Sequence, residues 1–98
     1  MDRESLERRW LELTRVVLPG MAAAARWPIR NDHCFMRVCL DAVFGGVWHR
    51  FIARPAIRSL SDEQLQFAVS IAARIVAEPG CLRALNQQSL DWRRAARA

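Results

Sequence analysis

Three polar residues recur at intervals of four along the most apolar segment of the sequence. If this segment is helical, His33, Arg37 and Asp41 lie about one turn apart, and Gly45 and His49 continue the spacing. In a pocket, His33 would be a general acid or base, Arg37 an anion clamp, and Asp41 the group that orients the clamp. The alternative is a buried hydrogen-bonded network in which Arg37 pairs with Asp41. We favour the network, because structural ion pairs imitate active sites.

Cys34 follows His33 in the first turn of the same predicted helix, where the helix dipole favours a thiolate. Neighbouring residues on a helix point about 100° apart, so His33 is badly placed to take the Cys34 proton. A buried, inert thiol is therefore the favoured interpretation. Cys34, Cys39 and Cys81 show no paired spacing, which predicts reduced thiols. Together with His33 and His49 they lack a recognised metal-ligand spacing, so we predict no metal site.

Apolar residues recur at helical spacing along almost the whole chain, and no segment alternates as a strand does. The pattern predicts an all-α fold, a compact bundle of four main helices plus a short Ala-rich helix, in a single domain over residues 1–98. The expected helices are 4–18, 21–26, 33–53, 62–77 and 79–88. The 33–53 helix is apolar on nearly every side and belongs in the centre. Residues 93–98 are expected to fray.

Local signals mark the ends of several of these helices. Pro19 and Gly20 stop or kink the first one. Asn31 or Asp32 caps the central helix, and Ser61 with Gln64 forms a capping box at residue 62. The Gly45-Gly46 pair inside the central helix needs a reason, which close helix packing, a kink or room for a ligand would each supply.

Arginine is the only strongly basic residue type, and its surplus lies in the first sixty residues and the tail. Fifteen Arg and no Lys face ten acidic residues, which gives a net charge of +5. This balance permits binding to nucleic acid, an anionic membrane surface or an acidic protein. The residues expected on such a binding surface are Arg8, Arg9, Arg83, Asn86, Gln87, Arg93, Arg94 and Arg97.

The last predicted helix has residue types that read base edges in a major groove. Arg83, Asn86 and Gln87 are of this kind, and the arginines after residue 92 would hold phosphates. The two helices flanking Pro79-Gly80 are faintly similar to a helix-turn-helix. A solvated helix face is nevertheless the favoured explanation for these residues.

Five segments together carry a weak resemblance to a known family. They are Trp27–Arg37, Asp41, Ala53–Ala56, Asp62–Leu65 and Leu85–Arg93. They resemble a family of small bacterial helical proteins, some of which are labelled GNAT-type acetyltransferases. That label would imply acetyl-CoA and acyl transfer. The pyrophosphate loop of those enzymes, Gln or Arg followed by x-x-Gly-x-Gly or Ala, is absent, so the resemblance assigns no catalytic residue.

These observations favour a non-enzymatic binding module whose arginine-rich surface contacts nucleic acid or an acidic protein. The alternative is a small enzyme or anion-binding protein, related to acyl transfer, with its site at His33, Cys34, Arg37 and Asp41. No cofactor is assigned. The charged N-terminus and the lack of a run of about 18 apolar residues predict a cytoplasmic protein without a membrane span. A helical domain of this size is also compatible with a homodimer.

Overall fold

The computed structural model describes residues 2–97, and all regular structure in this range is helical, as predicted. In chain order the elements are α1 (Arg3–Glu12), the π-helical segment η1 (Leu13–Val17), α2 (Leu18–Ala25), α3 (Asp32–Phe44), the 3-10 helix η2 (Trp48–Arg50), α4 (Ala56–Ser59), α5 (Asp62–Ala77) and α6 (Cys81–Arg97). None of these described helices combines the length and apolar character that crossing a bilayer requires.

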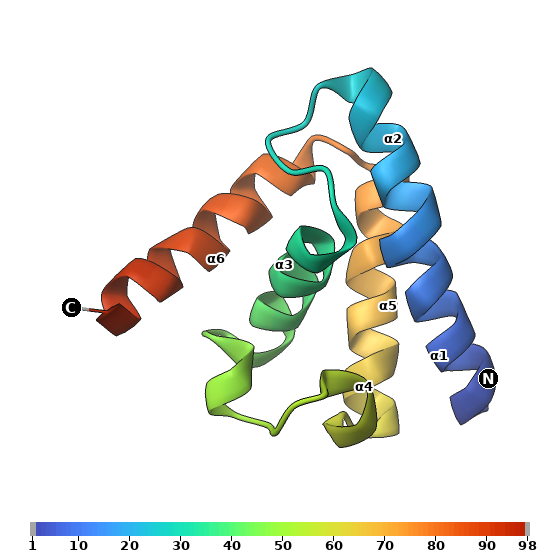
Figure 1. Ribbon diagram of the computed structural model, residues 1–98, viewed down its shortest axis with the longest axis vertical. Helices are drawn as coiled ribbons and strands as arrows, with labels where there is room; N and C mark the ends of the chain where they lie inside the picture. The colour runs from blue at the N-terminus through green and yellow to red at the C-terminus, as the bar shows by residue number, and fades with distance from the viewer. Residues whose placement is uncertain (1, 98) are drawn as a thin grey trace.

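Helix α3 lies in the centre of a flat molecule that measures 34 × 33 × 18 Å. It packs against α5 on one side and α6 on the other, while α1 lies beyond α5 (Figure 1). Residues from α1, η1, α3, α5 and α6 fill the core, among them Leu6, Trp10, Leu13, Phe35, Val38, Leu65, Ile75 and Leu82. The expectation of a central apolar helix is therefore confirmed, and α1 and α6 are on opposite sides of the molecule (Figure 1).

The first helix does not stop at Pro19, contrary to the predicted 4–18 boundary. The backbone stays helical from Arg3 to Ala25, with a π-helical turn immediately before the proline. There the Leu18 N–H donates to the Leu13 carbonyl, one residue further back than in an α-helix. Proline has no N–H and its ring crowds the preceding turn, and the wider π turn accommodates both effects. The run ends at Arg26, which has a left-handed backbone conformation with φ 55°.

The central helix is shorter than predicted, because it ends at Phe44 instead of residue 53. Gly45 adopts φ 69°, and its N–H donates to the Asp41 carbonyl to close the helix. A Cβ on Gly46 would lie 3.2 Å from the ring of Phe51, which stacks on Phe44 with 5.5 Å between ring centroids. The glycine pair thus serves a helix end and a close ring contact, and the chain then turns back through η2.

The C-terminal helix is longer than predicted, because α6 extends to Arg97 where fraying was expected after residue 92. Contacts near its end explain the difference: Arg93 is bound to Asp41 of α3, and Arg50 donates to the Ala96 carbonyl. The helix also begins at Cys81 and not at residue 79. The predicted α5 boundaries and their Ser61 capping box are confirmed, as is the Asn31 cap of α3.

Replacing glycine by alanine is expected to have opposite effects on stability at Gly45, which has a left-handed backbone, and at Gly20, which lies inside a helix. Gly45→Ala is expected to lower the free energy of unfolding by about 1 kcal/mol, because a Cβ disfavours the left-handed conformation. Gly20→Ala, inside α2, is expected to raise it by about 0.5–1 kcal/mol through helix propensity. An added Cβ meets no atom within 4 Å at either position, so packing changes are absent from both variants. Urea denaturation measures both effects, and a loss of stability in Gly20→Ala would contradict the comparison.

Candidate anion-binding cleft

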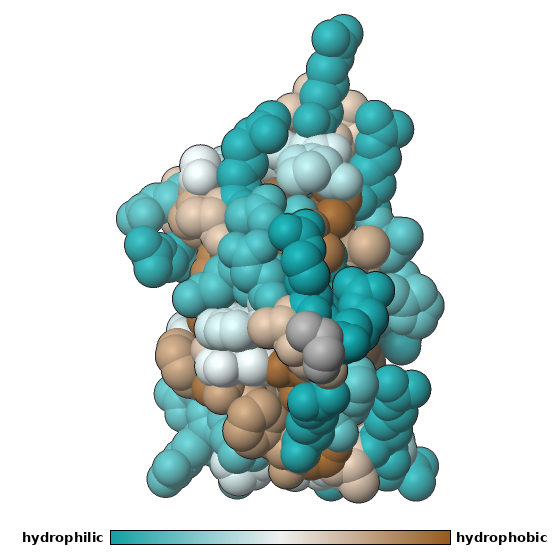
Figure 2. Space-filling model, turned by 90° about the vertical axis from the view of Figure 1, so that its left-hand side faces the viewer, coloured by the Kyte–Doolittle hydropathy of each residue, from teal (hydrophilic) through white to brown (hydrophobic). Residues whose placement is uncertain are grey.

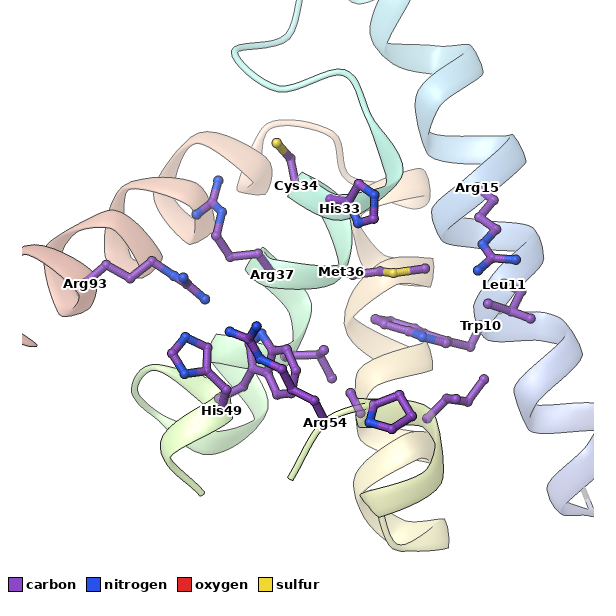
Figure 3. A pocket seen from close by; sticks show the side chains of 15 residues that line it. Trp10, Leu11, Arg15, His33, Cys34, Met36, Arg37, His49, Arg54 and Arg93 are labelled. Carbon is purple, nitrogen blue, oxygen red and sulfur yellow. The ribbon is translucent and has the colours of Figure 1, made fainter. Parts of the chain in front are cut away.

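A cleft of about 750 Å³ opens between α1, α3 and the connector that carries η2 and α4 (Figure 3). Its volume lies within the range of sites for small organic ligands. The lining residues are Trp10, Leu11, Arg15, His33, Cys34, Met36, Arg37, Leu40, Trp48, His49, Arg54, Pro55, Ala56, Ile57 and Arg93. They come from segments that are far apart in the sequence, so only the folded chain forms the cleft.

The lining combines apolar and basic side chains. Four arginines and two histidines belong to it, and none of the described residues that line it is Asp or Glu. The remaining lining residues are apolar, apart from Cys34. An apolar wall lowers the local dielectric and strengthens the attraction between an arginine and an anion.

The two kinds of side chain are separated along the cleft. Trp10 of α1 and Met36 of α3 extend toward one another at the α1 side (Figure 3). Arg93 extends from α6 toward His49, and Arg54 reaches the same side from the connector (Figure 3). We call the first region the apolar end, and the second, formed by His49, Arg54 and Arg93, the cationic end. Arg37 lies beside the second region, with its guanidinium directed toward α6 (Figure 3).

Asp41 lies behind the cationic end and does not line the cleft. Its side chain is fully buried and accepts hydrogen bonds from Ser89 Oγ at 2.6 Å and Arg93 Nε at 2.9 Å. It also accepts the backbone N–H of Trp48 at 3.0 Å. One carboxylate therefore fixes α6 and η2 on α3, and thereby fixes where Arg93 and Trp48 stand in the cleft.

Arg37 is joined to this network through neutral groups. Its Nη1 donates to Ser89 Oγ at 2.6 Å, and its Nη2 donates to Asn86 Oδ1 at 2.8 Å. Ser89 bridges Arg37 and Asp41, so the expected direct pair between these two residues is replaced by a relay. The charge of Arg37 thus has a hydroxyl and an amide as its partners, and no carboxylate.

The cleft arginines differ in how far their charge is balanced. Arg93 is paired with Asp41, and Arg15 Nε lies 4.0 Å from Asp32 Oδ2. Arg37 and Arg54 form no salt bridge within residues 2–97, and the Arg54 guanidinium lies 5.8 Å from the centre of the Trp48 ring. Two guanidinium charges of the lining are thus not balanced by a carboxylate among the described residues.

The environment of His49 also reflects this cationic character. Partial burial is the largest cause that lowers the pKa of His49 below 6.5, and the charges of Arg54 and Arg93 lower it further. The Asp41 carboxylate acts in the opposite direction and only partly offsets them. His49 is therefore biased toward its neutral form, in which one ring nitrogen donates a hydrogen bond.

The four candidate catalytic residues are only partly brought together. His33, Cys34 and Arg37 line the cleft, whereas Asp41 is enclosed in the network. The side chain of His33 is 89% exposed, and the Cys34 sulfur points away from it (Figure 3). The arrangement does not place an imidazole against the thiol as nucleophilic catalysis requires. Elsewhere in the core, burial raises the pKa of Cys39 to about 12, so that thiol is neutral.

The residues expected on a nucleic-acid or protein-binding surface fall into separate groups. Arg8 and Arg9 on α1 pair with Glu4 and Glu12. Asn86 is buried against Arg37, whereas Arg83, Gln87, Arg94 and Arg97 are exposed on α6. Hydrophilic side chains cover much of the α6 face (Figure 2). Because α1 and α6 are on opposite sides, these arginines do not form one continuous surface with Arg8 and Arg9.

Several site residues were missed by the sequence analysis or were expected in another role. Asn86 and Arg93, expected on an exposed binding surface, belong to the polar network around Arg37 and Asp41, and Ser89 was not singled out. The polar network on α6 continues the helical stripe that begins at a buried leucine: Leu82, Asn86, Ser89 and Arg93. Polar residues at positions that the helical period turns toward the core are the feature of the sequence that could have indicated this network. Arg54, Trp10 and Trp48 had no such signal as cleft residues, because the reversal of the chain at Gly45 brings them together.

Within residues 2–97, His, Cys, Asp and Glu side chains do not gather in groups of three or more that could hold a metal ion. The resemblance carried by Trp27–Arg37 stays a prediction. Comparisons with protein-family models, with curated protein sequences and with solved structures find no match to this chain.

Proposed function

We propose that this chain is a binding protein for an organic anion, with the apolar part of the ligand at the apolar end of the cleft and the anionic group at the cationic end. The observation that carries the proposal is the lining itself, in which four arginines and two histidines stand around apolar side chains without an acidic residue among the described ones. Concave, mostly apolar sites with a few convergent polar groups are typical of ligand sites.

Charge balance supports an anion in particular. Arg37 and Arg54 have no carboxylate partner in the described part of the chain, and guanidinium groups suit carboxylate and phosphate geometry. Arg37 is also held in place by Ser89 and Asn86, so little side-chain freedom is lost when a ligand binds. A broad nucleic-acid surface has less support, because the exposed arginines of α1 and α6 are on opposite sides of the molecule (Figure 1).

A pair of fluorescent probes tests both halves of the proposal. 8-Anilinonaphthalene-1-sulfonate carries an aromatic body and a sulfonate, and N-phenyl-1-naphthylamine is its neutral counterpart. We expect the anion to bind more tightly than the neutral probe. Arg54→Gln should weaken anion binding by about 1 kcal/mol, roughly fivefold, and leave the neutral probe unchanged. Titration followed by probe fluorescence gives all four dissociation constants.

Arg58→Gln is the matched control, because Arg58 is exposed on α4, does not line the cleft, and its loss changes the net charge equally. The native affinity for the anion should persist in this variant. Equal loss in Arg54→Gln and Arg58→Gln would mean that only net charge matters. That result, or equal binding of the two probes to the native chain, would overturn the proposal.

The pKa of His49 provides a second readout of the same event. An anion beside Arg54 and Arg93 offsets their charges, so NMR titration should show the His49 pKa rising when the sulfonate probe binds. Without ligand, His49 also makes stability depend on pH. Its pKa is lowered in the folded chain, so as pH falls the unfolded chain takes up the proton first. The contribution of His49 to stability is then lost as pH falls below 6.5 toward the folded-state pKa. An unchanged His49 pKa with saturating probe would place the anion elsewhere.

A further inference from the structure

A second, smaller hollow of about 310 Å³ adjoins the cationic end of the cleft. Its lining residues are Val47, His49, Arg50, Arg93, Ala96 and Arg97. His49 and Arg93 line both spaces, so these two side chains stand at the boundary between them. The positive lining therefore continues from the cleft past this boundary to the C-terminal end of α6.

The arginines of the second hollow are engaged mainly with backbone carbonyls. Arg50 Nη2 donates to the Ala96 carbonyl at 3.1 Å, and Arg97 Nε donates to the Arg93 carbonyl at 3.2 Å. A guanidinium has five N–H donors, so each of these contacts leaves donors for another acceptor. No Asp or Glu belongs to the described lining of this hollow either. The hollow thus has the charge and the donors that suit an anionic group.

We propose that the ligand is a nucleoside diphosphate, with one phosphate on each side of the boundary formed by His49 and Arg93. This inference rests on the proposed function, because it places the base and the first phosphate in the cleft. The second phosphate occupies the hollow beside Arg50 and Arg97. Two cationic spaces that share one pair of side chains match two anionic groups linked by a single bridging atom, whereas a ligand with one anionic group uses only the first space.

The apolar end suits the base of such a ligand. Trp10 lies at the apolar end, and the flat face of a nucleobase stacks on aromatic side chains without regard to base identity. Met36 extends toward Trp10 and adds an adaptable contact (Figure 3). We therefore expect the diphosphate, more than the identity of the base, to determine which nucleotide binds.

Calorimetric titration with ADP, AMP and adenosine in buffer without divalent cations tests the inference. We expect ADP to bind about tenfold more tightly than AMP, because each charge-assisted hydrogen bond adds measurably to affinity, and AMP to bind more tightly than adenosine. Arg97→Gln should remove most of the advantage of ADP and leave the AMP affinity unchanged. Arg94→Gln, an exposed arginine on the same helix that lines neither space, should keep the native preference.

Arg50→Gln gives an independent variant from a different element, and it should also remove the preference for ADP. Arg50 and Arg97 both donate to backbone carbonyls near the end of α6, so circular dichroism is measured on each variant, and the preference for ADP should be lost in a variant that keeps the native helicity. Equal affinity of ADP and AMP in the native chain would overturn the diphosphate inference. It would leave the proposed function standing where the sulfonate probe still depends on Arg54.

A ten-nucleotide single-stranded RNA separates the diphosphate from a longer polyanion. We expect it to bind no more tightly than ADP. Much tighter RNA binding that is weakened by both Arg97→Gln and Arg94→Gln, and that falls steeply with salt, would overturn the diphosphate inference in favour of a nucleic-acid chain. If Arg54→Gln changes neither the affinity for the sulfonate probe nor the affinity for ADP, the proposed function itself is overturned.

Discussion

Asp41→Ala is expected to lower the free energy of unfolding by about 3–4 kcal/mol, because it removes the acceptor for donors from two other segments, α6 and η2. The Asp41 side chain is fully buried, and it receives Ser89 Oγ, Arg93 Nε and the Trp48 N–H. Without it, a largely buried guanidinium loses its counter-charge and a backbone donor loses its partner. Urea denaturation followed by circular dichroism measures the change.

Two further variants separate charge from hydrogen bonding. Asp41→Asn keeps an acceptor for Trp48 and removes the charge, so its loss should be smaller than that of Asp41→Ala. Asp91→Ala is the matched control, since Asp91 is exposed on α6 and accepts only from Gln87 in the described structure. We expect that control to change stability by no more than about 0.5 kcal/mol. Similar losses in Asp41→Ala and Asp91→Ala would show that the buried network adds no more stability than an exposed hydrogen bond.

The network also explains how the fold and the cleft depend on one another. Asp41 points from α3 toward α6 and η2, and both of these elements carry cleft residues. Arg93 and Trp48 owe their positions directly to it, and Arg37 is held through Ser89. A single buried carboxylate thus organises the cationic end without touching the ligand space.

Helical periodicity was sufficient to predict the fold class, because buried apolar stripes have a period that the sequence displays directly. The α5 boundaries followed from a capping box that uses only residues three apart, Ser61 and Gln64. One error came from a local signal that was placed inside a helix: Gly45 ends α3 in the left-handed conformation. Another occurred where contacts distant in sequence decide, since α6 persists to Arg97 because Asp41 and Arg50 hold its end.

The site was foreseen in part for the same reason. Spacing by four placed Arg37 and Asp41 on one face of α3, and that face is where the polar network lies. Their bridge, Ser89, is 48 residues away from Asp41, so nothing local to α3 indicates it. The apolar end of the cleft depends on Trp10 of α1, which extends toward Met36 of α3 only in the packed bundle (Figure 3).

Phe35→Ala is expected to lower the free energy of unfolding by about 3–5 kcal/mol, because the emptied volume lies in the core. Phe35 is fully buried on the inner face of α3, and its ring meets that of Trp27 edge to face with 5.9 Å between centroids. The adjacent residues Cys34 and Met36 line the cleft, so the same helix joins core and site. Phe35→Leu retains most of the apolar volume and should lose clearly less stability.

Phe67→Ala is the matched control for this comparison, since Phe67 lies on α5 with 51% of its surface exposed. The same atoms are deleted, but they leave little cavity, and we expect a change within about 0.5 kcal/mol. Urea denaturation of Phe35→Ala, Phe35→Leu and Phe67→Ala gives the three values. Equal losses at positions 35 and 67 would contradict the placement of Phe35 in the core, and with it the orientation of α3 that turns Met36 and Arg37 toward the cleft.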